Sequence, residues 1–427
     1  MTKSGEQTNE RLLGYTGDAA MKPKPFSIMT KPIGPRCNID CAYCYYLEKE
    51  KLYPQEKKFQ MRPDVLESYI RQTIEASVEA GMTEVPFAWQ GGEPTMLGVD
   101  YFKQVVALQN KYAPAGTRIS NAFQTNGTLL NDDWGLFFKD SGFLVGISID
   151  GPRKVHDRYR IDRAKRPTFD AVMRGLEVLQ NHGVDHNALT TVHRANGGKG
   201  REVYRFLKGL GIEFMQFIPI AERAGTDGLA GAPQVDMDPG NTVTEWSVSS
   251  RAYGKFLCDV FDAWFARDIG KVFVQFFDVQ VGLWMGGRSS LCVFAETCGD
   301  GLAVEHDGSL YSCDHYVYPV YRLGNITDTP MRELLWNDTQ RQFGQDKATK
   351  LTAQCRSCQY RFACNGGCPK HRFAKSRDGE EGHDYFCEGH TMFFRHAGQR
   401  LKDMAGMVAS GRPASDAALT GTAGRQR

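Results

Sequence analysis

The sequence predicts an α/β fold, in which helices cover a parallel β-sheet. Across residues 26–219, short apolar runs alternate six times with longer stretches that have one apolar face. In the longer stretches apolar residues recur at helical spacings of three and four, as Ile70 and Ile74 do. Six such β–α repeats predict a parallel sheet, and the pattern leaves open whether it curves into a partial barrel or is doubly wound.

Each element of this fold can be placed by its pattern. Pro63 suits the first turn of a helix and Gly81 its end. The expected strands are Phe26–Pro32, Val85–Gln90, Ile119–Thr125, Leu144–Asp150, Ala188–His193 and Phe214–Pro219. The expected helices are Pro63–Ala80, Tyr101–Lys111, Phe169–His182, Arg201–Leu210, Ser250–Arg267 and Thr391–Met404, with a long loop at Ala221–Asn241.

Length and charge exclude several classes of protein. The 427 residues fit one large α/β domain and a smaller one. The 52 Lys and Arg residues against 50 Asp and Glu residues give a charge of +2, which offers no electrostatic basis for nucleic-acid or membrane partners. No apolar run is long enough to span a bilayer, and residues 1–24 lack an apolar signal core. We therefore expect a cytoplasmic protein, in which twelve cysteines indicate metal ligation rather than disulfides.

Three cysteines follow the first expected strand within eight residues. Cys37, Cys41 and Cys44 have the spacing C-x3-C-x2-C. A cubane iron–sulfur cluster has four irons, so three local thiolates would leave one iron open to bind a small molecule. A structural zinc site requires four ligands, and a disulfide requires an oxidising compartment. The loop is expected at the carboxyl edge of the sheet, where sites of α/β folds gather.

Other polar residues are expected at the same edge. Gly91, Gly92 and Glu93 follow the second strand, preceded by Gln90, and Ser148 lies near the end of the fourth. Glycines let the backbone approach a ligand closely, although an ordinary turn is the alternative use of such residues. Arg160 and Arg163 come next in the chain and are either ligand contacts or solvated surface charges.

A second group of cysteines begins at residue 292. Eight cysteines make two sets of four, which suit either two fully ligated iron–sulfur clusters or a pair of zinc sites. Cys258 stands apart on an expected helix and is interpreted as a packed core thiol. The eight cysteines are Cys292, Cys298, Cys313, Cys355, Cys358, Cys364, Cys368 and Cys387.

The stretch from Lys31 to Tyr46 resembles the signature of radical S-adenosylmethionine (SAM) enzymes, and the second group of cysteines resembles their SPASM extension. The resemblance implies a partial (β/α)6 barrel, a SPASM domain with two auxiliary clusters, and SAM with three [4Fe–4S] clusters as cofactors. The implied divisions are a flexible segment 1–24, the barrel 25–250, a linking helical region 251–290, the SPASM domain 291–395 and a largely disordered tail 396–427.

The same resemblance implies a role for each candidate residue. The SAM-binding cluster is held by Cys37, Cys41 and Cys44, and SAM is contacted by Gln90, Gly91, Gly92, Glu93, Ser148 and Arg160, with Arg163 as the alternative arginine. The first auxiliary cluster takes Cys292, Cys298, Cys313 and Cys368, and the second takes Cys355, Cys358, Cys364 and Cys387.

Within that family the sequence resembles anaerobic sulfatase-maturating enzymes. The matching motifs are KPIGP at residues 31–35, YCYYLE at 43–48, QGGEPT at 90–95 and CNGGCPK at 364–370. The resemblance implies oxidation of a Cys or Ser side chain in a sulfatase motif, Cys/Ser-x-Pro-x-Arg, to Cα-formylglycine. A 5′-deoxyadenosyl radical would remove the hydrogen atom from Cβ. A radical is needed because this C–H group is too weakly acidic for ordinary base catalysis. Asp314 matches the proposed general base, and Tyr46 would line the substrate pocket.

Partners follow from the same resemblance. The implied ones are an unfolded or nascent sulfatase chain and a reductase or a flavodoxin- or ferredoxin-type electron donor. Two other functions are compatible with the cysteines. One is crosslinking or rearrangement of another ribosomal peptide, and the other is a zinc-binding interaction protein.

Overall fold

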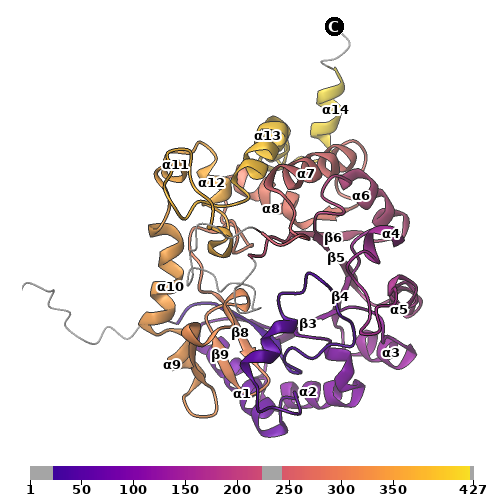
Figure 1. Ribbon diagram of the computed structural model, residues 1–427, viewed down its shortest axis with the longest axis vertical. Helices are drawn as coiled ribbons and strands as arrows, with labels where there is room; N and C mark the ends of the chain where they lie inside the picture. Colours follow the sequence, from indigo (N-terminus) through magenta and orange to yellow (C-terminus); the bar gives the residue numbers. More distant parts are fainter. Residues whose placement is uncertain (1–22, 224–242, 424–427) are drawn as a thin grey trace, which may run out of the picture.

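The computed structural model describes residues 23–223 and 243–423 (Figure 1). The expected flexible segment 1–24 and the expected loop 221–241 therefore lie largely outside the described residues. The strands are β1 (Ser27–Lys31), β2 (Glu84–Trp89), β3 (Arg118–Thr125), β4 (Leu144–Ser148), β5 (His186–Val192), β6 (Phe214–Pro219), β7 (Phe273–Val274), β8 (Gly301–Glu305), β9 (Ser309–Tyr311) and β10 (Arg322–Asn325).

Helices connect and flank these strands. They are α1 (Pro63–Glu79), α2 (Val99–Tyr112), α3 (Asp132–Asp140), α4 (Arg153–His156), α5 (Phe169–Asn181), α6 (Gly200–Gly209), α7 (Ser250–Phe265), α8 (Gln275–Trp284), α9 (Met331–Leu335), α10 (Asp338–Thr349), α11 (Ala353–Arg356), α12 (Arg361–Cys364), α13 (Cys387–Ala409) and α14 (Asp416–Ala423). Within residues 23–223 and 243–423, no helix is both long enough and apolar enough to cross a membrane.

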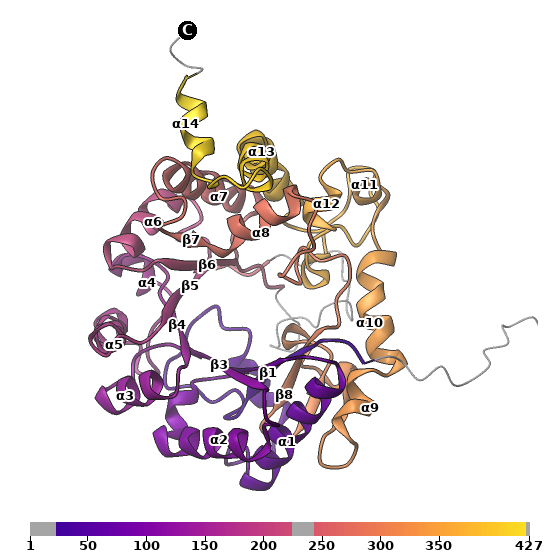
Figure 2. The same ribbon diagram turned by 180° about the vertical axis from the view of Figure 1, so that it is seen from behind.

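The strands form one open sheet in the order β10-β9-β8-β1-β2-β3-β4-β5-β6-β7. All neighbours from β8 through β1 to β7 are parallel, whereas β9 is antiparallel to both of its neighbours, β8 and β10. The sheet curves, with α1, α2, α3, α5 and α6 outside it (Figures 1 and 2). This is the partial barrel that the family resemblance implies, and the six expected β–α repeats are all present.

The sheet continues past the division expected at residue 290. Strand β8 joins the free edge of β1, in a register that pairs Lys31 with Glu305. The hairpin β8–β9 then leads directly to Cys313 and Asp314. Cys313 of the second group is thus connected to the sheet through β8 and β9, beside β1.

The core lies between the sheet and its outer helices. Trp89, Phe102 and Phe123 are buried there, and the rings of Phe102 and Phe123 meet edge to face with centroids 4.9 Å apart. Aromatic packing of this kind stabilises a core beyond the area that it buries. Alternate residues of the strands, such as Gln124 and Ser148, are only half-buried on the opposite, concave face.

The expectation of a largely disordered tail from residue 396 is wrong for the described residues. Helix α13 continues to Ala409, and α14 follows at Asp416–Ala423. Ala397, Leu401 and Met404 keep the helical spacing of three and four and are buried. The helix expected at Thr391–Met404 is thus present, and it continues five residues further, to Ala409.

Candidate active site

The three-cysteine loop lies at the carboxyl end of β1. Cys37 and Cys41 are buried, and Cys44 is half-buried. Two backbone hydrogen bonds hold the loop against the segment after α4: Asp40 donates to the carbonyl of Ile161 at 2.7 Å, and Ala42 donates to that of Tyr159 at 2.9 Å. The loop is thus placed by the chain that leaves β4.

Buried polar side chains hold the three-cysteine loop in place through hydrogen bonds. The hydroxyl of Tyr43 donates to Asp150 at 2.6 Å and accepts from the Arg160 guanidinium at 3.0 Å. The Arg163 guanidinium donates to the carbonyl of Cys37 at 2.8 Å. Both candidate arginines therefore contact the cysteine loop itself, and the SAM contact stays a prediction for each of them.

The turn at residues 90–93 packs directly on the stretch before the first cysteine. Gly92 donates to the carbonyl of Gly34 at 2.8 Å, and Glu93 donates to that of Arg36 at 2.8 Å. A Cβ on Gly92 would lie 1.7 Å from the Arg36 carbonyl oxygen, so only glycine fits. The motif fixes the position of the cysteine loop through backbone contact.

Glu93 ties the same turn to the end of β3. Its carboxylate accepts hydrogen bonds from the Thr95 hydroxyl at 2.6 Å, the Thr125 hydroxyl at 2.8 Å and the Asn126 amide at 2.7 Å. The side chain is fully buried. These contacts give Glu93 a structural part in the site, and its contact with SAM stays a prediction.

Ser148 and Gln124 lie side by side on the concave face of the sheet. The Gln124 amide donates to the Ser148 hydroxyl at 3.0 Å. A Cβ on Gly146 would lie 2.2 Å from the Gln124 side-chain oxygen, so the absence of a side chain at Gly146 makes room for this pair. Both half-buried side chains remain available to a ligand.

The structure gathers the first expected auxiliary set. The thiol of Cys313 interacts with those of Cys368 and Cys292, and Cys368 also interacts with Cys298. These four residues come from segments up to 76 positions apart, and Cys292 is the exposed member of the set. Their assignment as ligands stays a prediction, but the grouping in space is the expected one.

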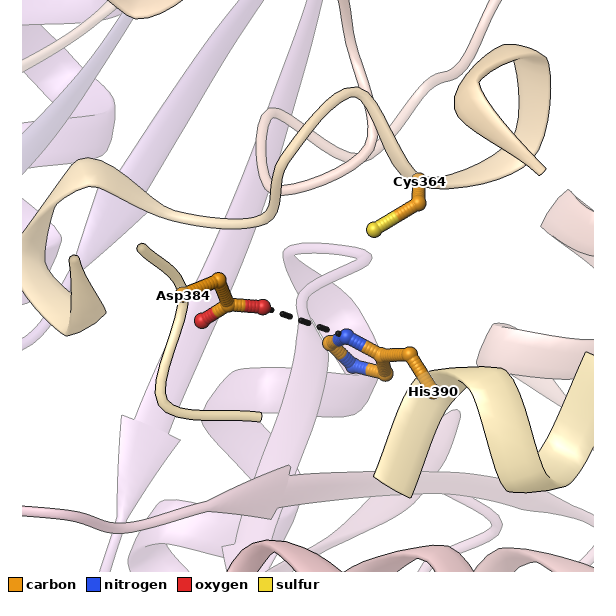
Figure 3. A group of neighbouring side chains, drawn as sticks. All are labelled: Cys364, Asp384 and His390. Atoms are coloured by element: carbon orange, nitrogen blue, oxygen red, sulfur yellow. Dashed lines mark ion pairs between the residues drawn. The ribbon is translucent and has the colours of Figure 1, made fainter. Parts of the chain in front are cut away.

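The second expected auxiliary set lines a cavity of about 280 Å³, to which all four of Cys355, Cys358, Cys364 and Cys387 contribute. Figure 3 shows Cys364 with Asp384 and His390, whose ligand atoms lie within 4.8 Å of one another. Asp384 and His390 carry no sequence motif that would have identified them. Because Cys364 is a member of the second set, this group is part of that site.

Cys258 lies apart from all three groups. It is half-buried on α7, where it packs against the core, and burial raises its pKa to about 11. This placement fits the expected packed thiol, although the side chain is less buried than expected.

Asp314 connects the cysteine loop to the first auxiliary set. It follows Cys313, its carboxylate lies 2.5 Å from the Lys31 ammonium, and it accepts a hydrogen bond from the Tyr45 hydroxyl at 2.5 Å. Burial alone would raise the pKa of Asp314, but Lys31, His315 and the hydrogen bond from Tyr45 together outweigh burial and lower the pKa to about 2. The carboxylate is therefore ionised at neutral pH and able to accept a proton.

Tyr46 lies beside the Lys31 ammonium, and its expected place in the substrate pocket stays a prediction. Its hydroxyl donates to Glu305, at the end of β8, and its ring lies 4.5 Å from the Lys31 ammonium. Tyr45, which the sequence did not single out, is the tyrosine that contacts Asp314. Lys31 is the shared neighbour of both pairs, and only the sheet register reveals it.

The thiols are poorly suited to carry charge on their own. Burial raises the pKa of Cys37 to about 12, of Cys44 to about 11 and of Cys368 to about 12. Thiolates in such places require a strong positive charge, which iron supplies, because a coordinated thiol is deprotonated. One set of three thiols and two sets of four fit three iron–sulfur clusters.

Comparisons with known proteins agree with this arrangement. Residues 32–207 match the Radical SAM superfamily, and residues 292–359 match SPASM, an iron–sulfur cluster-binding domain. The second match favours iron–sulfur clusters over the zinc sites that spacing left open.

Full-length relatives are more specific. A serine-type anaerobic sulfatase-maturating enzyme of Bacteroides thetaiotaomicron is 42% identical over 87% of this chain and 89% of that protein. A cysteine-type enzyme of Clostridium perfringens is 32% identical over 90% and 99%. The solved structure of native anSMEcpe with bound AdoMet and Kp18Cys peptide has a TM-score of 0.77 at 32% identity, over 90% of this chain and 99% of that one. The chain therefore belongs to the anaerobic sulfatase-maturating enzymes of the radical SAM superfamily.

Proposed function

We propose that this protein oxidises a Cys or Ser side chain of a sulfatase to Cα-formylglycine, in a Cys/Ser-x-Pro-x-Arg motif. The observation that carries the proposal is the 42% identity to a serine-type anaerobic sulfatase-maturating enzyme over most of both chains. The position of Asp314, between the three-cysteine loop and the first auxiliary set, supports it.

Different residues of the chain hold different cofactors. Cys37, Cys41 and Cys44 hold the cluster that binds SAM, and the turn at residues 90–93 and Ser148 contact SAM beside it. The two auxiliary sets hold the other clusters. When bound, SAM and the clusters supply a 5′-deoxyadenosyl radical and accept the electron that the substrate loses.

Asp314 takes the proton of the substrate. Oxidation of the Cβ radical turns its heteroatom into part of a carbonyl or thiocarbonyl, which makes the attached proton strongly acidic. With a Cys substrate, water then hydrolyses the thioaldehyde to the aldehyde and hydrogen sulfide leaves. A carboxylate with a pKa of about 2 is a weak base, yet it suffices for so acidic a proton. Lys31 and Tyr45 hold the carboxylate in place from two sides.

The substrate is a peptide segment of the sulfatase, presented before that protein folds. A reductase or a flavodoxin- or ferredoxin-type protein supplies the electrons. A reducing compartment such as the cytoplasm suits the twelve free cysteines, since thiolates must stay reduced to hold iron.

One anaerobic reaction tests the function. The reconstituted protein is incubated with SAM, dithionite and one of two peptides that differ only in Ser or Cys at the target position. Mass spectrometry should find the aldehyde in at least one of them. A peptide that forms an internal crosslink instead would contradict the proposal and support the modification of another ribosomal peptide.

A further inference from the structure

Helix α10 has an unusual buried face. Its buried residues are Gln340, Gly344 and Lys347, spaced by four and three, so they lie on one side of the helix. None of them is a large apolar residue, although hydrophobic contact is what normally fastens a helix to a core. The apolar contact of α10 comes instead from Phe343, whose ring meets that of Tyr316 edge to face with centroids 5.0 Å apart, while the fully buried face is polar.

The same face holds the loops that carry the first auxiliary set. Gln340 donates to the carbonyls of Gly299 at 2.9 Å and Ser312 at 3.1 Å, next to Cys298 and Cys313. A Cβ on Gly344 would lie 2.4 Å from the carbonyl oxygen of Cys298. Helix α10 thus packs directly against the first auxiliary set.

Lys347 places an ammonium group inside this packing. The residue is 0% exposed, and its Nζ donates to the carbonyls of Cys292 at 2.5 Å and Val293 at 3.1 Å, and to that of Ala295. The side chains of Cys298, Cys368 and Cys292 lie within electrostatic range of this ammonium. A buried cation needs compensating charge, and these cysteines would provide it as thiolates when they hold iron.

The second auxiliary set has a buried carboxylate beside it, where the first set has a buried ammonium group. Asp384 is buried, lies beside Cys364 and interacts also with Cys355 and Cys387 (Figure 3). The other buried cation, Arg372, interacts with Cys298 of the first set and with Cys355 of the second, so it does not distinguish them. Asp314 also adjoins the first set, at Cys313, but its charge is paired with the Lys31 ammonium at 2.5 Å. The remaining difference between the sets is Lys347 beside the first and Asp384 beside the second.

We propose that Lys347 is a positioning and charge-compensating residue that raises the reduction midpoint of the first auxiliary cluster above that of the second. Reduction adds one electron and no proton to a cluster, so it adds one negative charge. In a buried site of low dielectric constant, a nearby ammonium stabilises that charge and a nearby carboxylate opposes it. The set next to Asp314 is thereby the better electron acceptor. The inference rests on the iron–sulfur clusters of the proposed function and concerns none of its peptide chemistry.

The test is an anaerobic redox titration of the reconstituted protein, without peptide, followed by electron paramagnetic resonance. The signal of the first cluster is identified as the one that Cys292→Ala removes. Lys347→Met keeps the length of the side chain and removes the charge, so the first midpoint should shift to a more negative potential while the other two stay in place. Lys350→Met is the matched control, because Lys350 lies one turn away, is exposed and pairs with Asp346.

An unchanged first midpoint in a Lys347→Met protein that keeps all its iron would overturn the proposal. If Lys347→Met loses the first cluster, Lys347→Arg decides, since it keeps the charge. Retention of the cluster and of its midpoint in Lys347→Arg supports the role of charge, and loss of the cluster there as well overturns it. Failure of the peptide assay would affect the proposed substrate and leave these midpoints unchanged.

Discussion

The three-cysteine loop and the auxiliary sets both present cysteine sulfur atoms as ligands, but they bring these atoms together in different ways. The loop draws three thiols from eight consecutive residues, placed at one strand end by backbone contacts to the turn at residues 90–93. The auxiliary sets draw four thiols each from loops and helix ends that are far apart in sequence. Three ligands leave one iron open to SAM, whereas four close a cluster to everything except electrons. Under the proposed function, one region would start the reaction and the other would receive its electron.

The largest expected effect comes from removing the loop cysteines. The triple change of Cys37, Cys41 and Cys44 to Ala should abolish SAM cleavage, because no iron is left to bind SAM. About a third of the roughly twelve irons expected for three four-iron clusters should also be lost. Iron analysis and chromatography of 5′-deoxyadenosine measure both.

Cys258→Ala is the control, since Cys258 lies outside the three groups. It should keep full iron and full SAM cleavage. SAM cleavage that persists in the triple variant would show that the loop does not hold the SAM-binding cluster.

The next effect separates the two regions at Asp314. Asp314→Asn keeps the size of the side chain and removes its charge. Formylglycine should fall by roughly 10²–10⁴-fold, the usual loss when a general base is removed, while 5′-deoxyadenosine is still formed. A deuterated peptide should still transfer deuterium into 5′-deoxyadenosine.

Iron must be measured in the same sample, because Asp314 adjoins Cys313. A variant that keeps its iron and makes formylglycine at the wild-type rate would make Asp314 purely structural. Tyr45, its hydrogen-bond partner, or Tyr46 would then be the next candidate to examine.

The two regions also differ in how far sequence could predict them. The loop and the turn at residues 90–93 are local motifs that follow strands, so their shared edge of the sheet could be predicted. Lys31, Tyr45 and Lys347 could not, because their partners depend on register and helix packing. Lys31 meets Asp314 only since β8 pairs with β1 across 274 residues of sequence. Lys347 appeared to be an ordinary lysine in a polar helix.

Glycine contacts offer a smaller, matched test of the comparison. In each region one glycine touches a cysteine-bearing segment: Gly92 meets the Arg36 carbonyl and Gly344 meets the Cys298 carbonyl. Since backbone cannot move aside as a side chain can, a methyl group at either site should cost about 1–3 kcal/mol. Gly92→Ala should weaken SAM cleavage, and Gly344→Ala should instead lower the iron content of the first auxiliary set.

Gly209→Ala is the control for both, because a Cβ there has no heavy atom within 4 Å among the described residues. Thermal unfolding, iron analysis and 5′-deoxyadenosine yield are compared across the three variants. Identical defects in Gly92→Ala and Gly344→Ala would mean that the two regions are not independent, contrary to the comparison drawn above.

The smallest expected effect is a loss of folding stability at low pH, and it arises next to the three-cysteine loop. His156 is fully buried against Asp150 and Thr168, and burial lowers its pKa from 6.5 to about 3. Below pH 6.5 the unfolded chain therefore binds a proton that the folded protein does not. The contribution of this group to stability should fall as the pH drops through 6.5 toward 3, with a slope that approaches about 1.4 kcal/mol per pH unit, and should level off above about pH 7.5. His156→Gln keeps a polar side chain without the titration, so the gap in unfolding free energy between the wild type and this variant should shift by about 1 kcal/mol between pH 6.5 and 5.5. Equal slopes for the two proteins in anaerobic urea unfolding would mean that His156 becomes protonated without cost, and that the polar group beneath the three-cysteine loop is more accessible to water than its burial indicates.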